Sequence, residues 1–455
     1  MTRMTRPDAA SDRNGFRAAL RRPRMTEWIG DTFTSDVGWS HLERLVDIGD
    51  RMAGSEGEHR ALEATREALA DVGARDARVD SFPVQGWVRG DSAVVAGDRT
   101  LPSIALPRSP SASATGRLVD LGDGLPADFD RDLSGDVVLV SSTVPDHVDR
   151  FIHRREKYYR AVDAGAAAFV FRNHVPGQLP PTGSVGTEDA PIGDIPAVGV
   201  SKEVGAQLAR RDADTAVTVQ VDCEVPEAES GNVHADVGPD TDAAVYLTSH
   251  VDAHDIAEGA LDNGAGTAMV VEVARILTER ADDLDTRVHL ACFGSEEVGL
   301  VGSGHDAATA DDVRAVCNLD GVCAGRTLKA HVGGFDGVGD AFERVGRRYD
   351  HPVTVVPEHL PHSDHWPFVA RGLPGCMVSA ETGDRGRGWG HTEADTLDKL
   401  EARTFREQAV LLAEVLVELA RADADLEPLP GEQVAAALET QGEAEGMRLT
   451  GDWPF

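Results

Sequence analysis

The sequence predicts an α/β protein in which helices cover both faces of a mostly parallel sheet. From about residue 231, apolar runs such as DAAVYLTSH and TRVHLACFG alternate with helical stretches, which is typical of such a sheet. A compact strand–helix–strand unit of its own precedes this alternation, between residues 113 and 226. The chain has 455 residues, which is enough for more than one compact unit.

The first part of the larger unit is expected over residues 25–112. Two helical segments occupy 40–72, with Gly-Ser at 54–55 between them and Gly73 at the end, and strand-like segments follow. Residues 1–24 are basic, but no apolar core follows them, so they do not form a secretory signal. We expect this N-terminal tail to be disordered.

The middle unit, 113–226, shows clear strand and helix patterns. GDVVLVSS (135–142) and AAFVFRN (167–173) read as strands, and RFIHRREKYYRAVDAGA (150–166) between them reads as a helix closed by a glycine. The segment IPAVGVS, a further strand, leads into the helix KEVGAQLARR.

The main part of the larger unit is expected over 227–425. Its best helix is GTAMVVEVARILTER, and an amphipathic helix at 404–422 closes the unit. The helix GTAMVVEVARILTER has five apolar residues on one face: Met269, Val270, Val273, Ile276 and Leu277. Residues 426–455 are expected to form an acidic C-terminal tail.

The charge of the chain excludes several kinds of partner. It has 78 acidic and 44 basic side chains, a formal net charge of −34, and would repel nucleic acid and anionic membranes. The hydrophobic content of 41% argues against disorder, so we expect a protein adapted to high salt, with an ordinary acidic protein as the alternative. No stretch has the apolar length of a membrane span.

The five cysteines suggest a reducing compartment. Their number is odd, two of them lie inside apolar runs, and no CxxC motif is present. We therefore expect reduced thiols in a cytoplasmic protein.

Polar residues gather at the carboxyl ends of the apolar runs, where ligands bind in open α/β sheets. Two histidines and several carboxylates cannot be gathered uncompensated, because like charges brought together raise each other's pKa or require cations. A His and carboxylate set without thiolates is typical of a hydrolytic zinc site. There are more carboxylates than one ion needs, which suggests two ions. The residues are His250, Asp252, Asp262, Glu296, Glu297, Asp320 and His391.

The motifs around these residues occur in an order that resembles a known family. HVD, DNGAG, SEEVGL, NLD, HSDHWPF and GHTEADT, over about 231–425, are similar to the co-catalytic zinc aminopeptidases and carboxypeptidases of peptidase family 28. RMAGSEGEHRALEATREAL also fits the opening helices of that family. Residues 113–226, with VVLV, AVDAGAAAFVFRN and IPAVGVSKEVGAQL, resemble the protease-associated (PA) domain.

The resemblance implies a three-layer αβα zinc-peptidase domain with a mostly parallel mixed sheet, plus a smaller inserted α/β PA domain that covers the site or helps to bind substrate. It also implies metal ligands. Asp262 would bridge two zinc ions, His250 and Asp320 would complete one site, and Glu297 and His391 the other.

Two further residues receive roles from the resemblance. Asp252 would hold the imidazole of the neighbouring ligand by a hydrogen bond, and Glu296 would act as general base on the zinc-activated water. The HSDH loop borders the site in the family, and the sequence leaves open whether His362, Asp364 or His365 shapes it.

The sequence departs from the family pattern at one position. Several members carry a tyrosine before the last metal histidine, where this chain has Gly390, so oxyanion stabilisation must come from the metals or from another group. Four other histidines match no family position and are expected to be structural or on the surface: His254, His289, His305 and His331.

The expected function is therefore that of a cytoplasmic di-zinc exopeptidase acting on peptides, with an aminopeptidase as the leading prediction. Cobalt or manganese could replace zinc, and a homo-oligomer is left open. The alternatives are a metallo-carboxypeptidase, an amidohydrolase of the related aminoacylase type, a mono-zinc cyclotransferase and a non-catalytic binding protein on the same fold.

Overall fold

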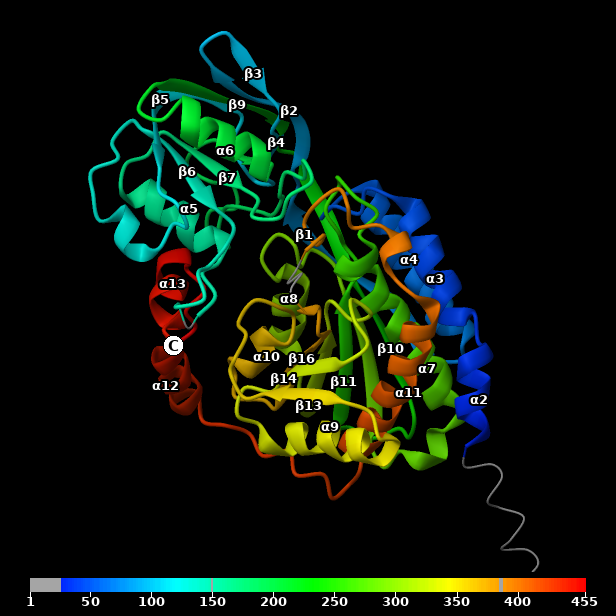
Figure 1. Cartoon of the computed structure of the whole chain (residues 1–455). Coiled ribbons are helices and arrows are strands. Elements are labelled where there is room, and N and C mark those ends of the chain that lie inside the picture. Colours follow the sequence, from blue (N-terminus) through cyan, green and yellow to red (C-terminus); the bar gives the residue numbers. More distant parts are fainter. Residues whose placement is uncertain (1–25, 149, 384–387) are drawn as a thin grey trace, which may run out of the picture.

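The structure, a computed structural model, describes residues 26–148, 150–383 and 388–455 and contains two eight-stranded sheets (Figure 1). One sheet belongs to the larger, peptidase-like domain. The other belongs to a smaller domain, which lies beside the upper edge of the larger one in Figure 1. The expected N-terminal tail, 1–24, lies outside the described residues.

The sheet of the larger domain is mixed but mostly parallel in its centre, as predicted. Strands β12, β11, β13 and β16 are parallel neighbours, whereas β10 and β1 add antiparallel strands at one edge and β14 pairs antiparallel with β16. In sheet order the strands are β1 (Arg75–Gln85), β10 (Glu227–Val237), β12 (Arg287–Phe293), β11 (Ala244–His250), β13 (Val313–Leu319), β16 (Gly375–Ala380), β14 (Leu328–His331) and β15 (Val353–Val356).

Helices cover both faces of this sheet and make three layers (Figure 1). One face carries α2 (Glu27–Thr34), α3 (Val37–Ile48), α4 (Glu56–Asp71), α7 (Ala265–Glu279), α9 (Asp336–Tyr349) and α11 (Ala402–Leu419). The other face carries α8 (Val301–Thr309) and α10 (Trp366–Val369). Short 3₁₀ turns occur at Pro126–Phe129, Ala281–Asp283 and Leu397–Lys399.

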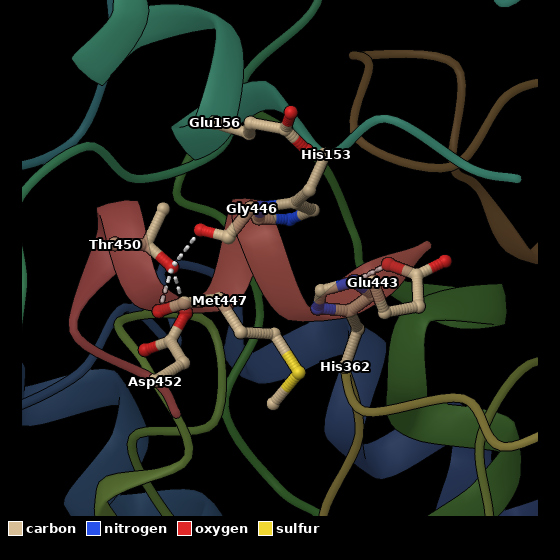
Figure 2. A pocket seen from close by; sticks show the side chains of 8 residues that line it. All are labelled: His153, Glu156, His362, Glu443, Gly446, Met447, Thr450 and Asp452. Atoms are coloured by element: carbon tan, nitrogen blue, oxygen red, sulfur yellow. Dashed lines mark hydrogen bonds and ion pairs between the residues drawn. The ribbon is translucent and has the colours of Figure 1, made fainter. Parts of the chain in front are cut away.

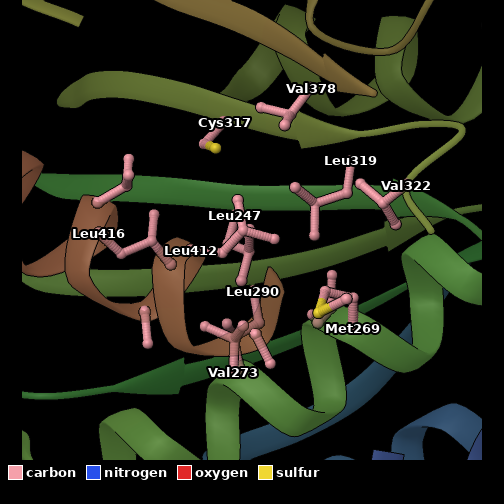
Figure 3. Packing of buried hydrophobic residues seen from close by; sticks show 14 of the residues in the cluster. Leu247, Met269, Val273, Leu290, Cys317, Leu319, Val322, Val378, Leu412 and Leu416 are labelled. Carbon is pink, nitrogen blue, oxygen red and sulfur yellow. The ribbon is translucent and has the colours of Figure 1, made fainter. Parts of the chain in front are cut away.

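The core of the larger domain lies between the sheet and helices α7 and α11. Figure 3 shows Met269 and Val273 of α7 packed with Leu412 of α11 against Leu247 and neighbouring sheet residues. The segment is helical, as predicted, and all five residues of its predicted apolar face are fully buried. Burial of this stripe holds α7 rigidly on the sheet, and the loop before α7 belongs to the site described below.

The smaller domain is larger than the sequence predicted. Its sheet has the order β3 (Arg99–Leu101), β2 (Val88–Ala96), β9 (Ala216–Glu224), β5 (Ala112–Asp120), β6 (Val137–Ser141), β7 (Ala168–Arg172), β8 (Ala197–Val200) and β4 (Ile104–Ala105), with helices α5 (Arg154–Asp163) and α6 (Lys202–Arg211). The expected boundary at 112/113 therefore falls inside this domain, because β2 pairs with β9, β3 pairs with β2, and β4 pairs with β8. Alternation along the chain cannot reveal which of two sheets an antiparallel strand will join.

The C-terminal segment is also more ordered than a tail. Helices α12 (Gly431–Gln441) and α13 (Glu443–Thr450) cross from the larger domain to α5 of the smaller one (Figure 1). Arg155 of α5 pairs with Asp452 at 3.0 Å, and a Cβ at Gly446 would approach Glu156 to 2.4 Å, so the contact is close. Figure 2 shows the small pocket at this junction, where His362 of the HSDH loop meets α13.

Two expectations from composition can be compared with the structure. All five cysteines have free thiols, which agrees with the absence of a disulfide framework. Within 26–148, 150–383 and 388–455, no helix is long and apolar enough to cross a membrane.

Candidate metal centre

Three parallel strands bring polar residues to one edge of the sheet. Strand β11 ends at His250, β13 is followed directly by Asp320, and β12 ends three residues before Glu296. Because β12, β11 and β13 are parallel neighbours, their carboxyl ends lie at the same edge. The structure thus brings together residues that lie some 70 positions apart in the chain.

The loop before α7 adds Asp262 to this edge. A single turn at Ala260–Gly264 precedes the helix, and the carboxylate of Asp395 accepts hydrogen bonds from the main-chain N–H groups of Leu261 (2.7 Å) and Asp262 (3.0 Å). The side chain of Asn263 donates to the carbonyl of Leu319 at 2.7 Å, which ties the turn to the end of β13. Asp395 was not among the predicted site residues, although it lies in the HTEADT motif.

The two oxygens of Asp262 approach two different histidines. Oδ1 lies 3.4 Å from Nε2 of His250, and Oδ2 lies 3.2 Å from Nε2 of His391. Two ligand atoms that bind the same tetrahedral zinc ion, each at about 2.0–2.1 Å, lie about 3.3 Å from each other. Each separation therefore suits a pair of donors that could hold a zinc ion between them.

Donor atoms form two groups around Asp262. One consists of His250, Glu296 and Asp320, and the other of His254, Glu297 and His391. The sequence analysis expected the pair His250 and Asp320 and the pair Glu297 and His391, and the structure brings the members of each pair together.

His254 lies in the second donor group, whereas the sequence predicted a structural or surface position for it. Its side chain is only 4% exposed, and its Nε2 lies 2.9 Å from Oε2 of Glu297, which is in turn 3.1 Å from Nε2 of His391. His254 follows His250 by four residues, so its spacing could have drawn attention to it. The extended loop that carries it could be placed only by the tertiary structure.

The donor set fits a metal ion. Nε2 of His250, Nε2 of His254 and Oε1 of Glu297 are buried without a hydrogen bond of acceptable geometry among the described residues, although carboxylates lie within ion-pair distance of both histidines. Buried polar atoms are almost always hydrogen-bonded, so such atoms call for an ion. Imidazole and carboxylate donors without a thiolate suit catalytic zinc.

Asp252 acts mainly on the paired glutamates. Its carboxylate oxygens accept from the main-chain N–H groups of Glu296 (3.0 Å) and Glu297 (3.1 Å). The imidazole of His250 bonds through Nδ1 to the main-chain carbonyl of Asp252 at 3.1 Å, whereas the carboxylate is 3.5 Å away. The expected bond to the imidazole therefore comes chiefly from the backbone of Asp252, and its carboxylate orients the glutamate loop.

The buried carboxylate of Glu58 from α4 holds the residue before the glutamate pair. Glu58 accepts from the N–H of Gly54 at 2.6 Å and from the N–H of Ser295 at 2.9 Å. Burial, assisted by the charge of Asp252, raises the pKa of Glu58 to about 8. The RMAGSEGEH motif thus reaches the site through Glu58, a role that the sequence analysis did not predict.

Ser363 is the member of the HSDH loop that contacts the site directly. Its hydroxyl donates to Oδ2 of Asp320 at 2.7 Å and accepts from Nδ2 of Asn318 at 2.8 Å, so it orients the aspartate. Asp364 is fully buried, and burial raises its pKa to about 7 against the opposing charge of His250.

The other two candidates of this loop lie in different surroundings. His365 is buried, and desolvation lowers its pKa to about 3. His362 lies at the junction with the smaller domain, where its ring stacks on that of His153 with the centroids 4.8 Å apart.

The two glutamates have opposite electrostatic surroundings. Burial, together with the charge of Glu297, raises the pKa of Glu296 well above its usual range, and the charge of His250 only partly opposes this. Burial would also raise the pKa of Glu297, but His254 and His391 hold it well below its usual range.

The other three histidines that match no family position are structural, as expected. His289 donates from Nδ1 to the carboxylate of Asp236 at 2.8 Å, and its Nε2 shares a hydrogen bond with Nδ1 of His234 at 3.0 Å. The ring of His305 packs on Phe82, with the centroids 5.2 Å apart. Desolvation lowers the pKa of the half-buried His331 to about 4.

Comparisons with known proteins agree with this geometry. Residues 232–416 match the model of peptidase family M28, and residues 114–208 match the model of the PA domain. Over 408 residues the chain is 26% identical to aminopeptidase YwaD of Bacillus subtilis, with 85% of each chain covered.

Solved structures show the same fold. The aminopeptidase from Aneurinibacillus sp. strain AM-1 superposes with a TM-score of 0.67 at 26% identity, covering 89% of this chain and 98% of that one. A zinc aminopeptidase from Bacillus subtilis superposes with a TM-score of 0.67 at 22% identity, covering 86% of this chain and 97% of that one.

Proposed function

We propose that the chain is a zinc-dependent aminopeptidase of peptidase family M28 with an inserted PA domain, because residues 232–416 and 114–208 match the models of these two families. The aminopeptidases from B. subtilis and Aneurinibacillus, which match most of its length, support this activity. A peptide with a free amino terminus is the corresponding substrate.

We propose two zinc ions per chain. The observation that carries this proposal is the position of Asp262, whose two oxygens approach one histidine from each donor group, His250 and His391. A carboxylate shared in this way suits a bridging ligand. Asp320 would complete the first ligand set, and Glu297, with His254 beside it, the second.

When bound, zinc would polarise the scissile carbonyl and lower the pKa of a water molecule, so that this water can lose a proton and attack the carbonyl. Glu296 is the proposed proton carrier. It would take the proton from that water and pass it to the leaving amine. The carboxylate of Asp252 accepts hydrogen bonds from the main-chain N–H groups of both Glu296 and Glu297. These bonds fix the position of the proposed base, Glu296, relative to the proposed ligand, Glu297.

The setting of the enzyme is also a proposal. We propose a cytoplasmic protein that works at high salt. The free thiols and the net charge of −34 support this setting.

A panel of blocked peptides tests the activity. The same peptide would be assayed with both ends free, with an acetylated amino terminus and with an amidated carboxyl terminus, each with and without a chelator. We expect acetylation to abolish cleavage, amidation to leave cleavage measurable, and zinc to restore what the chelator removes. If acetylated peptides are cleaved and amidated ones are not, the enzyme is a carboxypeptidase. If none is cleaved by the zinc-loaded protein, the chain is not an exopeptidase.

A further inference from the structure

The PA domain contacts all three loops that carry the second donor group. His254, Glu297 and His391 lie on three separate irregular segments of the larger domain. The PA domain forms a hydrogen bond to each segment, either at the donor residue itself or at the residue that directly follows it. The position of these loops therefore depends on contacts between the two domains.

Arg89, the second residue of β2, holds the loop of His254. Its Nε and Nη2 donate to the two carboxylate oxygens of Asp255, at 2.7 and 2.5 Å, and Asp255 directly follows His254. The two side chains are only 12% and 19% exposed, so salt screens this bidentate pair weakly. Nη1 of Arg89 donates to the carbonyl of Ala105, which anchors the arginine within the PA domain.

Arg108 holds the loop of Glu297 in a similar way. It lies between β4 and β5, is 3% exposed, and donates from Nη1 to the carbonyl of Val298, which directly follows Glu297. Its own carbonyl accepts from the N–H of Gly193 at 2.8 Å, so Arg108 is fixed to the PA domain at its base.

The contact with His391 is made by the main chain. The N–H of Thr182, between β7 and β8, donates to the carbonyl of His391 at 2.8 Å. The hydroxyl of Thr182 in turn accepts from Nη2 of Arg89 at 3.4 Å. One arginine thus links the contacts to the loops of both histidines, His254 and His391.

The first donor group is positioned by the larger domain. The buried Arg51 donates from Nε to the carbonyl of Val251, which directly follows His250, at 3.0 Å. The bonds described above that orient Glu296 and Asp320 also come from the larger domain. The two donor groups therefore differ in which domain holds their loops.

We propose that Arg89 and Arg108 are positioning residues of the second zinc site, through which the PA domain gives that site its full affinity for zinc. The inference rests on the proposed pair of zinc ions. Groups that orient metal ligands typically change metal affinity by about 10- to 100-fold when they are removed. A shift of the PA domain away from the larger domain would loosen the second ion and leave the first in place.

The test measures zinc binding and not turnover. Arg89→Met, Arg89→Lys and Arg108→Met are compared with wild type and with the control Arg160→Met. Arg160 joins α5 of the PA domain to Glu445 of α13 at 2.9 Å, so its loss removes a contact of the PA domain that does not involve a ligand loop. For each protein, zinc per chain and two zinc dissociation constants are measured by competition with a chelator at one KCl concentration, together with the melting temperature.

We expect wild type and Arg160→Met to bind two ions with the same two dissociation constants. Arg89→Met and Arg108→Met should bind one ion as wild type does and the other about 10- to 100-fold more weakly. Arg89→Lys should recover part of this loss, because lysine keeps the charge but lacks the planar fork that binds both carboxylate oxygens.

Two ligand variants identify the affected site. Asp320→Asn weakens the first site, so the tighter remaining ion should lie in the second, and adding Arg89→Met should weaken that ion. Glu297→Gln weakens the second site, so adding Arg89→Met should leave the tighter remaining ion unchanged.

Several results would overturn the proposal. One is two unchanged dissociation constants in Arg89→Met, which decides the matter even if the buried Arg108 cannot be replaced without unfolding. Equal weakening of both ions would make the arginines general stabilisers of the fold, and an equal effect of Arg160→Met would assign the effect to domain docking as a whole. A single zinc ion in wild type would instead contradict the two-ion centre, and this inference with it.

Discussion

Glu296 and Glu297 are neighbours in the chain, yet their carboxylates lie in different donor groups. Glu296 lies with His250 and Asp320, and Glu297 lies with His254 and His391. Asp252 fixes the backbone of both glutamates, so the division follows from the directions of two successive side chains and needs no movement.

Replacing each glutamate by glutamine should separate the two roles. Glu296→Gln keeps the shape but loses the base, so turnover should fall by about 10²- to 10⁴-fold while the zinc content stays that of wild type. Glu297→Gln replaces a charged ligand by a weaker neutral one, so zinc should bind more loosely and added zinc should restore part of the activity. Elemental analysis beside turnover decides the matter. If Glu296→Gln loses zinc and Glu297→Gln retains it, the roles are reversed.

His254 offers a second test at the same scale. His254→Ala removes an imidazole that lies 2.9 Å from Glu297, so we expect weaker binding of one zinc ion, seen as a lower zinc content after dialysis against a mild chelator. His305→Ala, at a histidine that packs on Phe82 away from the centre, is the control and should keep wild-type zinc content. Unchanged zinc affinity in His254→Ala would mean that His254 contacts the substrate or Glu297 alone.

At the scale of elements, helix α13 joins the two domains. It packs on α5, and Glu443 at its start faces His362 of the larger domain, with 4.0 Å between Oε2 and Nε2 (Figure 2). Burial, together with the charge of Glu156, raises the pKa of Glu443 to about 7, although Arg150 opposes this. Desolvation lowers the pKa of His362 to about 4, so at neutral pH the imidazole does not offset the charge of Glu443.

This shift predicts how stability changes with pH. A carboxyl whose pKa rises on folding contributes stability below its unfolded pKa, near 4.5, and that contribution is lost as pH rises through about 7. Glu443→Gln should therefore match wild type near pH 4.5 and exceed it above pH 7 by up to about 3 kcal/mol.

Unfolding curves at pH 5 and pH 8 check this prediction. Glu445→Gln, at an exposed position two residues further along α13, is the matched control and should show no such gain. An equal gain for both variants at pH 8 would point to general charge repulsion and not to Glu443.

At the scale of the whole molecule, the charge of −34 governs the response to salt. Repulsion among surface carboxylates is screened over about 10 Å at 0.1 M salt and about 3 Å at 1 M. We therefore expect the melting temperature to rise steeply between 0.1 M and 2 M KCl, and activity to rise with it. Sucrose at matched osmolarity, which does not screen charge, is the control. An unchanged melting temperature in dilute buffer would contradict a salt-adapted protein.

Much of this molecule can be predicted from the sequence because the relevant patterns are local. The face of α7 follows from a period of 3.6 residues, and β11, β12 and β13 follow from short apolar runs. The candidate donors His250, Glu297 and Asp320 follow because polar residues directly after such runs must lie at the edge of the sheet.

The other features of the site depend on contacts between distant segments, so only the tertiary structure reveals them. Glu58 reaches Ser295 over 237 positions, and Ser363 reaches Asp320 over 43, so no periodicity reports either bond. His254 lies in an irregular loop, and the residues packed around its side chain, Glu297 and His391, set the direction of that side chain.

The same reason applies to the two larger corrections. Strands β2, β3 and β4 could have extended either sheet, and only the pairing of β2 with β9 and of β4 with β8 assigned them to the PA domain. Residues 431–450 are acidic and read as a tail, but α13 packs on α5 of the smaller domain and α12 buries Val434 and Leu438 in the core of the larger one. Both surfaces form only when the domains have folded. The fold class and the order of the candidate ligands along the chain can be predicted without the structure, because both follow from short-range pattern. The packing of the two domains decided what surrounds those ligands, because buried contacts between distant segments form only in the complete fold.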